Sequence, residues 1–235
     1  MAYFNNIRLI GSSHIAKESI EFIKSVIKVG QPDIIAVELD KGRLGSLLSN
    51  EQSLDWRIVF RIGLKGFLFA LIGSYVQKKL GKTVGVMPGA DMLAAIKEAK
   101  ANDKQLELID QNIEITLARF SKALTWKERW NFIADIFNAL FFRKREMKRL
   151  GLENLDLSKV PSEKIIRKMI DGIKVRYPNI YRVLIDERNK FMASRLYILS
   201  RQNPTKKILA VVGAGHEEGM MEELGILEKN NIKIQ

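Results

Sequence analysis

The sequence lacks several features that would point to common kinds of active site. Its 235 residues include no cysteine, which excludes disulfide bonds, thiolate nucleophiles and cysteine-based zinc sites. It also lacks an HExxH zinc motif and the G-x-S-x-G turn of serine hydrolases. Residues 1–10 show no basic segment followed by a long apolar one, so we expect no signal peptide and a cytoplasmic location.

Long apolar runs are also scarce. The most apolar stretch, residues 58–76, is interrupted by Arg61 and Lys65, which leaves only residues 66–76 without charge. A span of the bilayer needs about 20 apolar residues. Two interpretations stay open: a buried or dimer-forming helix, whose glycines permit close contact, and a helix that dips into a membrane. The first favours a homodimer.

Acidic residues are few in the middle of the chain. The net charge is +12 overall, yet residues 116–207 hold 22 Lys and Arg against 9 Asp and Glu, while the remainder holds 17 against 18. Such a block is typical of a solvated helical surface. It can also bind polyanions or an anionic membrane surface peripherally, without reading a nucleic-acid sequence.

Histidine is the scarcest of the residue types that carry catalytic chemistry here. The two histidines are His14 and His216, and each follows a short apolar segment (residues 7–10 and 208–212) and a glycine turn. A strand, a glycine turn and a helix in this order place the histidine at the carboxyl end of the strand, where open α/β sheets bind ligands. If the two strands are neighbours, both imidazoles face one site.

Carboxylates occur at further strand ends. Glu38 closes the apolar segment 34–39, and Asp110 closes the segment 104–110. With helical patterns between these segments, the sequence predicts an α/β fold in which consecutive strands are parallel neighbours. We expect a mixed or mostly parallel sheet built from an N-terminal α/β core (1–115) and a C-terminal βα unit (208–235), with a large basic helical insertion (116–207).

These groups predict a metal site at the edge of the sheet. His14, Glu38 and His216, with Asp110 or Glu187 as a further candidate, suit a divalent ion such as Mn, Co or Zn. Glu187 would act as acid or base, and Arg188 would stabilise an oxyanion or bind a substrate carboxylate. Alternatively, each histidine is a turn residue that is hydrogen-bonded to the backbone. The candidate substrate-binding residues are Ser13, Arg43, Asp110, Gly213 and Gly215.

Nucleotide binding is a weaker interpretation. The glycines at 213, 215 and 219 follow a strand as in dinucleotide-binding loops, but a Rossmann unit also needs a following strand with an acidic residue about 20 positions on. We find no such strand before Gln235.

Several segments also resemble the TraB (TraB/PrgY) family, particularly its archaeal members, within the wider Tiki-like group. The matching residues are 10–19 (IGSSHIAKES), 32–43 (PDIIAVELDKGR), 85–95 (GVMPGADMLAA), 108–116 (LIDQNIEIT), 186–189 (DERN) and 212–216 (VGAGH). They follow the family order across nearly the whole chain. The family pattern usually has arginine at position 111 and glutamate at position 91, where this chain has Gln111 and Asp91.

The resemblance implies a function. Tiki proteins are metal-dependent proteases that use paired glycine–histidine motifs with a supporting glutamate and arginine, which map onto His14, His216, Glu38 and Arg188. PrgY-type members act against peptide pheromones, which implies peptide substrates or ligands. We therefore expect a metal-dependent, peptidase-like hydrolase. The alternative is a non-catalytic protein that sequesters a peptide or signal, with the basic block docked on an anionic membrane.

Overall fold

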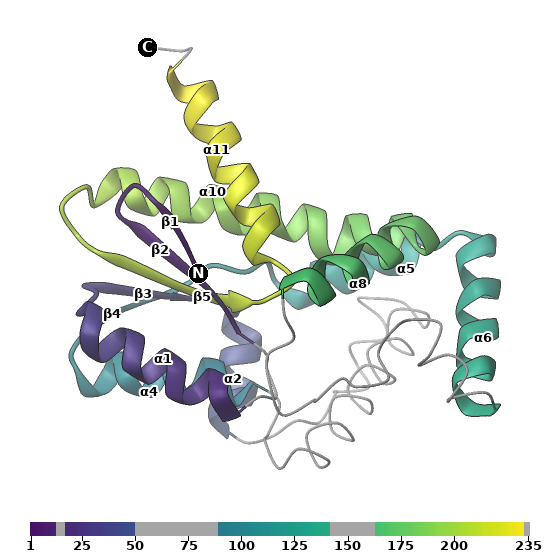
Figure 1. The fold of residues 1–235 in the computed structure, drawn as a ribbon, viewed down its shortest axis with the longest axis horizontal. Helices are drawn as coiled ribbons and strands as arrows, with labels where there is room; N and C mark the ends of the chain where they lie inside the picture. Colours follow the sequence, from purple (N-terminus) through teal and green to yellow (C-terminus); the bar gives the residue numbers. More distant parts are fainter. Residues whose placement is uncertain (13–16, 50–88, 142–162, 233–235) are drawn as a thin grey trace.

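Five strands of the described residues form one sheet in the order β1-β2-β5-β3-β4 (Figure 1). The computed structural model describes residues 1–12, 17–49, 89–141 and 163–232. The strands are β1 (Ala2–Phe4), β2 (Ile7–Ser12), β3 (Ile34–Val37), β4 (Gln105–Leu108) and β5 (Ile208–Gly213). All pairings are parallel except that of β1 with β2. The expected mixed, mostly parallel α/β sheet is confirmed.

The C-terminal strand β5 lies at the centre of the sheet. Every residue of β5 is buried, because its apolar side chains alternate between two hydrophobic clusters on opposite faces. Leu209 and Val211 pack on one face, and Ala210 and Val212 on the other. Strand β2 pairs in parallel with β5 along its whole length, so the two strands that precede the histidines are neighbours, as the sequence suggested.

One expectation about the strands is wrong. Strands β2 and β3 are parallel but not neighbours, because β5 pairs with both and separates them. The N-terminal strands form the hairpin β1–β2, whose turn contains Asn5 with a positive φ of 48°, a conformation that asparagine adopts more readily than most residues.

Helices cover both faces of the sheet (Figure 1). Helices α1 (Lys17–Gly30) and α4 (Ala90–Ala101) pack together on one face. Helices α10 (Glu187–Gln202) and α11 (Glu217–Ile232) pack together on the other. Helix α2 (Lys41–Ser49) follows directly after β3. In this three-layer arrangement, helices α2, α5 and α11 begin just after the carboxyl ends of β3, β4 and β5.

Between β4 and β5, the regular elements in the described residues are all helices, as expected for the insertion. They include α5 (Ile113–Ala123), α6 (Trp126–Phe141), α8 (Glu163–Arg176), α9 (Pro178–Tyr181) and a π-helix η2 (Arg182–Asp186) that runs into α10. Helix α6 stands away from the sheet in Figure 1. No helix among the described residues is long and apolar enough to cross a membrane. The apolar stretch 58–76 lies outside the described residues, and the domain boundaries stay a prediction.

Candidate functional site

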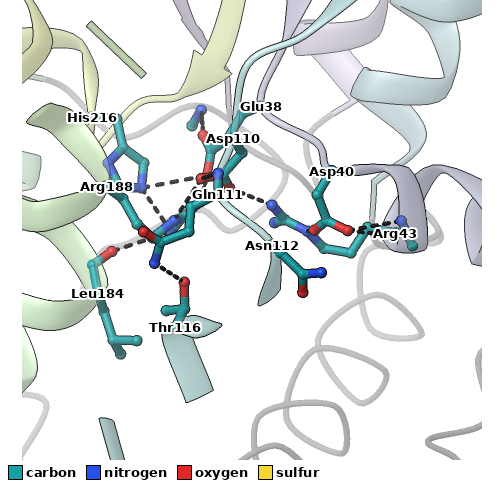
Figure 2. A network of polar contacts seen from close by, with 12 residues as sticks. Glu38, Asp40, Arg43, Asp110, Gln111, Asn112, Thr116, Leu184, Arg188 and His216 are labelled. Carbon is teal, nitrogen blue, oxygen red and sulfur yellow. Dashed lines mark hydrogen bonds and ion pairs between the residues drawn. The ribbon is translucent and has the colours of Figure 1, made fainter. Parts of the chain in front are cut away.

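Acidic, basic and imidazole side chains meet at the carboxyl edge of the sheet (Figure 2). Glu38 directly follows β3, Asp110 follows β4, and His216 lies in the turn after β5. Parallel pairing of these three strands aligns their ends, so side chains far apart in the sequence become neighbours. Arg188 enters the same space from the first turn of α10.

Arg188 lies at the centre of this cluster. Its Nη2 donates to Glu38 Oε1 and, at 2.5 Å, to Asp110 Oδ2, while its Nε lies 3.2 Å from Asp110 Oδ1. Its Nη1 donates to the Leu184 carbonyl oxygen in η2 at 3.2 Å. Burial alone would lower the pKa of Arg188, but the charges and hydrogen bonds of Glu38 and Asp110 outweigh burial and raise that pKa. The guanidinium is therefore permanently charged.

His216 is held by both of its ring nitrogens. Nδ1 lies 2.7 Å from Asn189 Oδ1, and Nε2 lies 3.1 Å from Arg188 Nη1 and 3.4 Å from Glu38 Oε1. An amide oxygen only accepts hydrogen bonds, so Nδ1 carries a proton. In the neutral ring Nε2 is then the acceptor and receives the N–H of Arg188 Nη1.

Asn189 reaches His216 because Gly219 leaves room for it. A Cβ atom on Gly219 would lie 2.2 Å from Asn189 Nδ2, far inside van der Waals contact. Gly219 lies in the first turn of α11 and adjoins the Nδ2 atom of the amide, whereas Oδ1 faces the imidazole. The small residue on α11 thus permits the hydrogen bond that fixes the imidazole.

Glu38 is buried, with 5% of its surface exposed. Its Oε1 accepts from Arg188, and its Oε2 accepts from the backbone N–H of Gly213 at 2.6 Å. A carboxylate in a protein interior is costly unless it is paired and hydrogen-bonded. Both requirements are met here, and the position of Glu38 is fixed relative to β5.

A second arginine extends the cluster toward solvent. Arg43 donates through Nε to Asp40 Oδ2 at 2.6 Å and through Nη2 to Asp110 Oδ2. Asp40 Oδ1 also accepts from the N–H groups of Gly42 and Arg43 at the start of α2. Among the described residues, three carboxylates (38, 40 and 110) thus face two guanidinium groups (43 and 188).

The structure brings together most of the predicted site residues that it describes. Besides Glu38, Asp110, Arg188 and His216, these are Arg43 and, through its N–H group, Gly213. Glu187 points elsewhere: its carboxylate pairs with Arg119 at 2.9 Å and with Arg182 at 3.8 Å. Gly215 lies in the turn before α11. Ser13 and His14 lie outside the described residues.

Three residues that shape the site did not stand out as such in the sequence. Asn189 and Gly219 cooperate across two helices, and no spacing rule signals that pairing. Asp40 could have been found, because an aspartate directly before a helix commonly accepts hydrogen bonds from the first N–H groups of that helix.

The two departures from the family pattern are both buried. Gln111 is buried, and its Nε2 donates to Thr116 Oγ1 at 2.8 Å. Asp91 is buried at the start of α4 and accepts from Ser12 Oγ at 2.5 Å. Both side chains thus bind within the protein, Gln111 to α5 and Asp91 to the end of β2.

Among the described residues, no group of three or more His, Asp and Glu side chains is arranged to hold a metal ion. Two of the three ligands predicted from the sequence, Glu38 and His216, do lie side by side.

Comparison with known proteins identifies the family. The family model described as TraB/PrgY/gumN matches residues 4–235. The chain belongs to the TraB/PrgY/gumN family. It is 38% identical over 230 residues to the uncharacterized protein MJ1365 of Methanocaldococcus jannaschii, which covers 96% of this chain and 55% of that protein. It is 22% identical to the TraB domain-containing proteins of mouse and human, over 92% of this chain and 62% of each relative.

The chain therefore spans little more than half the length of these relatives. The match confirms the resemblance, including its archaeal type. Because the family model matches residues 4–235, the cluster around Arg188 lies within the matched region.

Proposed function

We propose that this TraB family member is a metal-dependent hydrolase that acts on a peptide or peptide-like bond at the carboxyl edge of the sheet. One observation carries the proposal: His216 Nε2 and Glu38 Oε1 lie 3.4 Å apart, and the opposite atom of each side chain is anchored. Asn189 holds Nδ1 of the imidazole, and Gly213 holds Oε2 of the carboxylate.

These two donors suit a divalent ion in spacing and in chemistry. Ligand atoms that bind Zn²⁺ at about 2.0–2.1 Å with tetrahedral angles are separated by about 3.3–3.4 Å. A metal-binding histidine ordinarily donates its other N–H to a protein oxygen, as His216 does to Asn189. His14 is the proposed third ligand. A bound ion would activate water and polarise a carbonyl group.

The remaining residues would position the substrate. Arg188 carries a permanent charge beside the two proposed ligands and is anchored to Asp110, so it would stabilise negative charge on the carbonyl oxygen of a scissile bond. Arg43, 28% exposed, would contact a substrate carboxylate at the outer side of the cluster. Glu187 is the candidate proton carrier, which requires its carboxylate to leave Arg119.

The test is a peptide-cleavage assay. The purified protein would be incubated with a mixture of synthetic peptides and Mn²⁺, Co²⁺ or Zn²⁺, and the products read by mass spectrometry. Cleavage should depend on the added ion and be lost in His216→Ala and Glu38→Gln. Glu107→Gln is a change of the same kind at a β4 glutamate whose described contact is with Gln105, outside the cluster, and it should cleave like wild type. Cleavage that persists in His216→Ala would refute the proposal.

The second candidate is a non-catalytic peptide- or signal-binding protein, docked through its basic helical block on an anionic membrane. The internal pairing of the cluster favours this candidate. Arg188 already binds Glu38 and Asp110, and such ion pairs would hold a binding surface rigid. Thermal unfolding with and without divalent ions separates the two candidates. A metal enzyme gains stability from the ion, and His14→Ala removes that gain, whereas a binding module is indifferent.

A further inference from the structure

The guanidinium of Arg188 and the proposed ion use the same two ligand atoms. Arg188 Nη2 binds Glu38 Oε1, and Arg188 Nη1 lies 3.1 Å from His216 Nε2. These are the atoms that would face a divalent ion. Ligand bonds of about 2 Å leave no room for a guanidinium in hydrogen-bond contact with the same lone pairs. The two cations therefore exclude each other.

We propose that Arg188 is an exchangeable internal cation, which holds Glu38 and His216 when no metal is bound and is displaced when a divalent ion enters. This inference rests on the proposed function, and it concerns how the same site is controlled. In the arginine-bound form, the guanidinium compensates Glu38 and preserves the spacing of the two ligand atoms.

Arg188 keeps a partner after such a displacement. Its Nε lies 3.2 Å from Asp110 Oδ1, a contact that involves neither Glu38 nor His216 and that remains while Nη1 and Nη2 turn away from them. A buried guanidinium needs such a partner, because an unpaired charge in the interior is very costly. Asp110 thus provides a fixed pivot for the arginine.

The other arginine of the cluster differs from Arg188 in its contacts. Arg43, the other guanidinium, contacts Asp40 and Asp110 and is not hydrogen-bonded to Glu38 or His216 in the described contacts. It contributes the same charge as Arg188 without occupying the two proposed ligand atoms.

This difference allows a sharp test. When a binding-competent state is only partly populated, the apparent affinity falls by the populated fraction. Removing Arg188 should therefore tighten metal binding, although it removes a contact of both ligands. We would measure the dissociation constants of Mn²⁺ and Zn²⁺ by calorimetry for wild type, Arg188→Gln and Arg43→Gln. We expect at least about tenfold tighter binding for Arg188→Gln and a markedly smaller change for Arg43→Gln.

Stability provides a second readout. Without metal, Arg188→Gln should unfold at a lower temperature than wild type, because Glu38 loses its counter-ion. With metal, it should gain more stability than wild type gains. If Arg188→Gln does not fold, Arg188→Lys replaces it. A lysine keeps the charge but cannot bridge Glu38, Asp110 and His216 as a planar guanidinium does, so it should also bind the ion more tightly than wild type.

The outcomes separate the two proposals. If wild type binds an ion and the Arg188 variant binds it no more tightly, the exchange is refuted while the metal site stands. If Arg43→Gln tightens binding as much as Arg188→Gln, the effect is one of general charge and the exchange is likewise refuted. If neither wild type nor any variant binds Mn²⁺ or Zn²⁺, the metal site itself is refuted, and the exchange with it.

Discussion

Replacing Gly219 by alanine should destabilise this protein, although glycine in a helix is normally a weak point. A Cβ at position 219 would lie 2.2 Å from Asn189 Nδ2 and 3.2 Å from Asn189 Cγ. The amide of Asn189 would have to move by more than about 1 Å to reach ordinary contact distance. That shift breaks its 2.7 Å hydrogen bond to His216 Nδ1. Gly225 on the same helix has nothing within 4 Å of the added atom.

The magnitude follows from two opposing effects. A buried hydrogen bond that is lost with its partner left in place costs about 1–3 kcal/mol. Alanine in place of glycine within a helix returns about 0.5–1 kcal/mol. Gly219→Ala should therefore lower the free energy of unfolding by up to about 2.5 kcal/mol, or up to about 10 °C in Tm for a chain of this size. Gly225→Ala, which meets no neighbour, should raise stability by about 0.5–1 kcal/mol.

Thermal and urea unfolding of both variants would measure this difference. A third variant, Asn189→Ala, removes the side chain that the new methyl group meets. In that background Gly219→Ala should become neutral or stabilising, because the clash and the hydrogen bond are both gone. If Gly219→Ala is as stable as Gly225→Ala in the wild-type background, Asn189 is not held between α11 and the imidazole, and the account of His216 positioning is refuted.

Three further predictions concern other ion pairs and hydrogen bonds. Glu38→Gln removes one of the two carboxylates paired with Arg188 and should cost about 3 kcal/mol in urea unfolding; a loss below about 1 kcal/mol would contradict a buried pair. Burial would raise the pKa of Glu128, but hydrogen bonds from Thr125 and Asn179 instead lower it below 4.5, so its stabilisation is present above pH 4.5 and is lost as pH falls through the lower folded value. The stability deficit of Glu128→Gln should accordingly shrink in acid, and a constant deficit would argue against this pairing. Burial, followed by the hydrogen bond to Asp135, raises the pKa of Tyr177 to about 12, so its stabilising effect should be lost as pH rises from 10 to 12, and an ultraviolet titration should contain one late tyrosine that Tyr177→Phe removes.

The sequence predicted the sheet edge well, because its signals are local. An apolar, β-branched segment followed by glycine and histidine identifies the end of β5. The carboxylate of Glu38 is conspicuous in an otherwise apolar segment. Parallel pairing then makes neighbours of residues that end different strands. The position of β5 between β2 and β3 could not be obtained this way, since the hydrophobic pattern shows that a strand is buried but not which strands flank it.

Side-chain partnerships were harder to predict. Glu187 and Arg188 are adjacent in the sequence, between other polar residues. Arg188 nevertheless lies in the cluster, whereas Glu187 pairs with Arg119. The π-helix η2 sets the rotation of this turn, and no residue pattern indicated it. Gly219 stood out as part of a glycine-rich loop. Its effect is instead to leave space for Asn189 within a regular helix, which only the packing of two helices reveals.

Metal binding by the purified protein tests the central claim most directly. Metal content and affinity would be measured for wild type, His14→Ala, His216→Ala and the double variant, with Zn²⁺, Mn²⁺ and Co²⁺ each supplied at micromolar levels. The account predicts one ion per chain in wild type, weaker binding in each single variant, and none in the double variant. Absence of binding to wild type, or full binding to the double variant, would contradict a shared site formed by His14, Glu38 and His216.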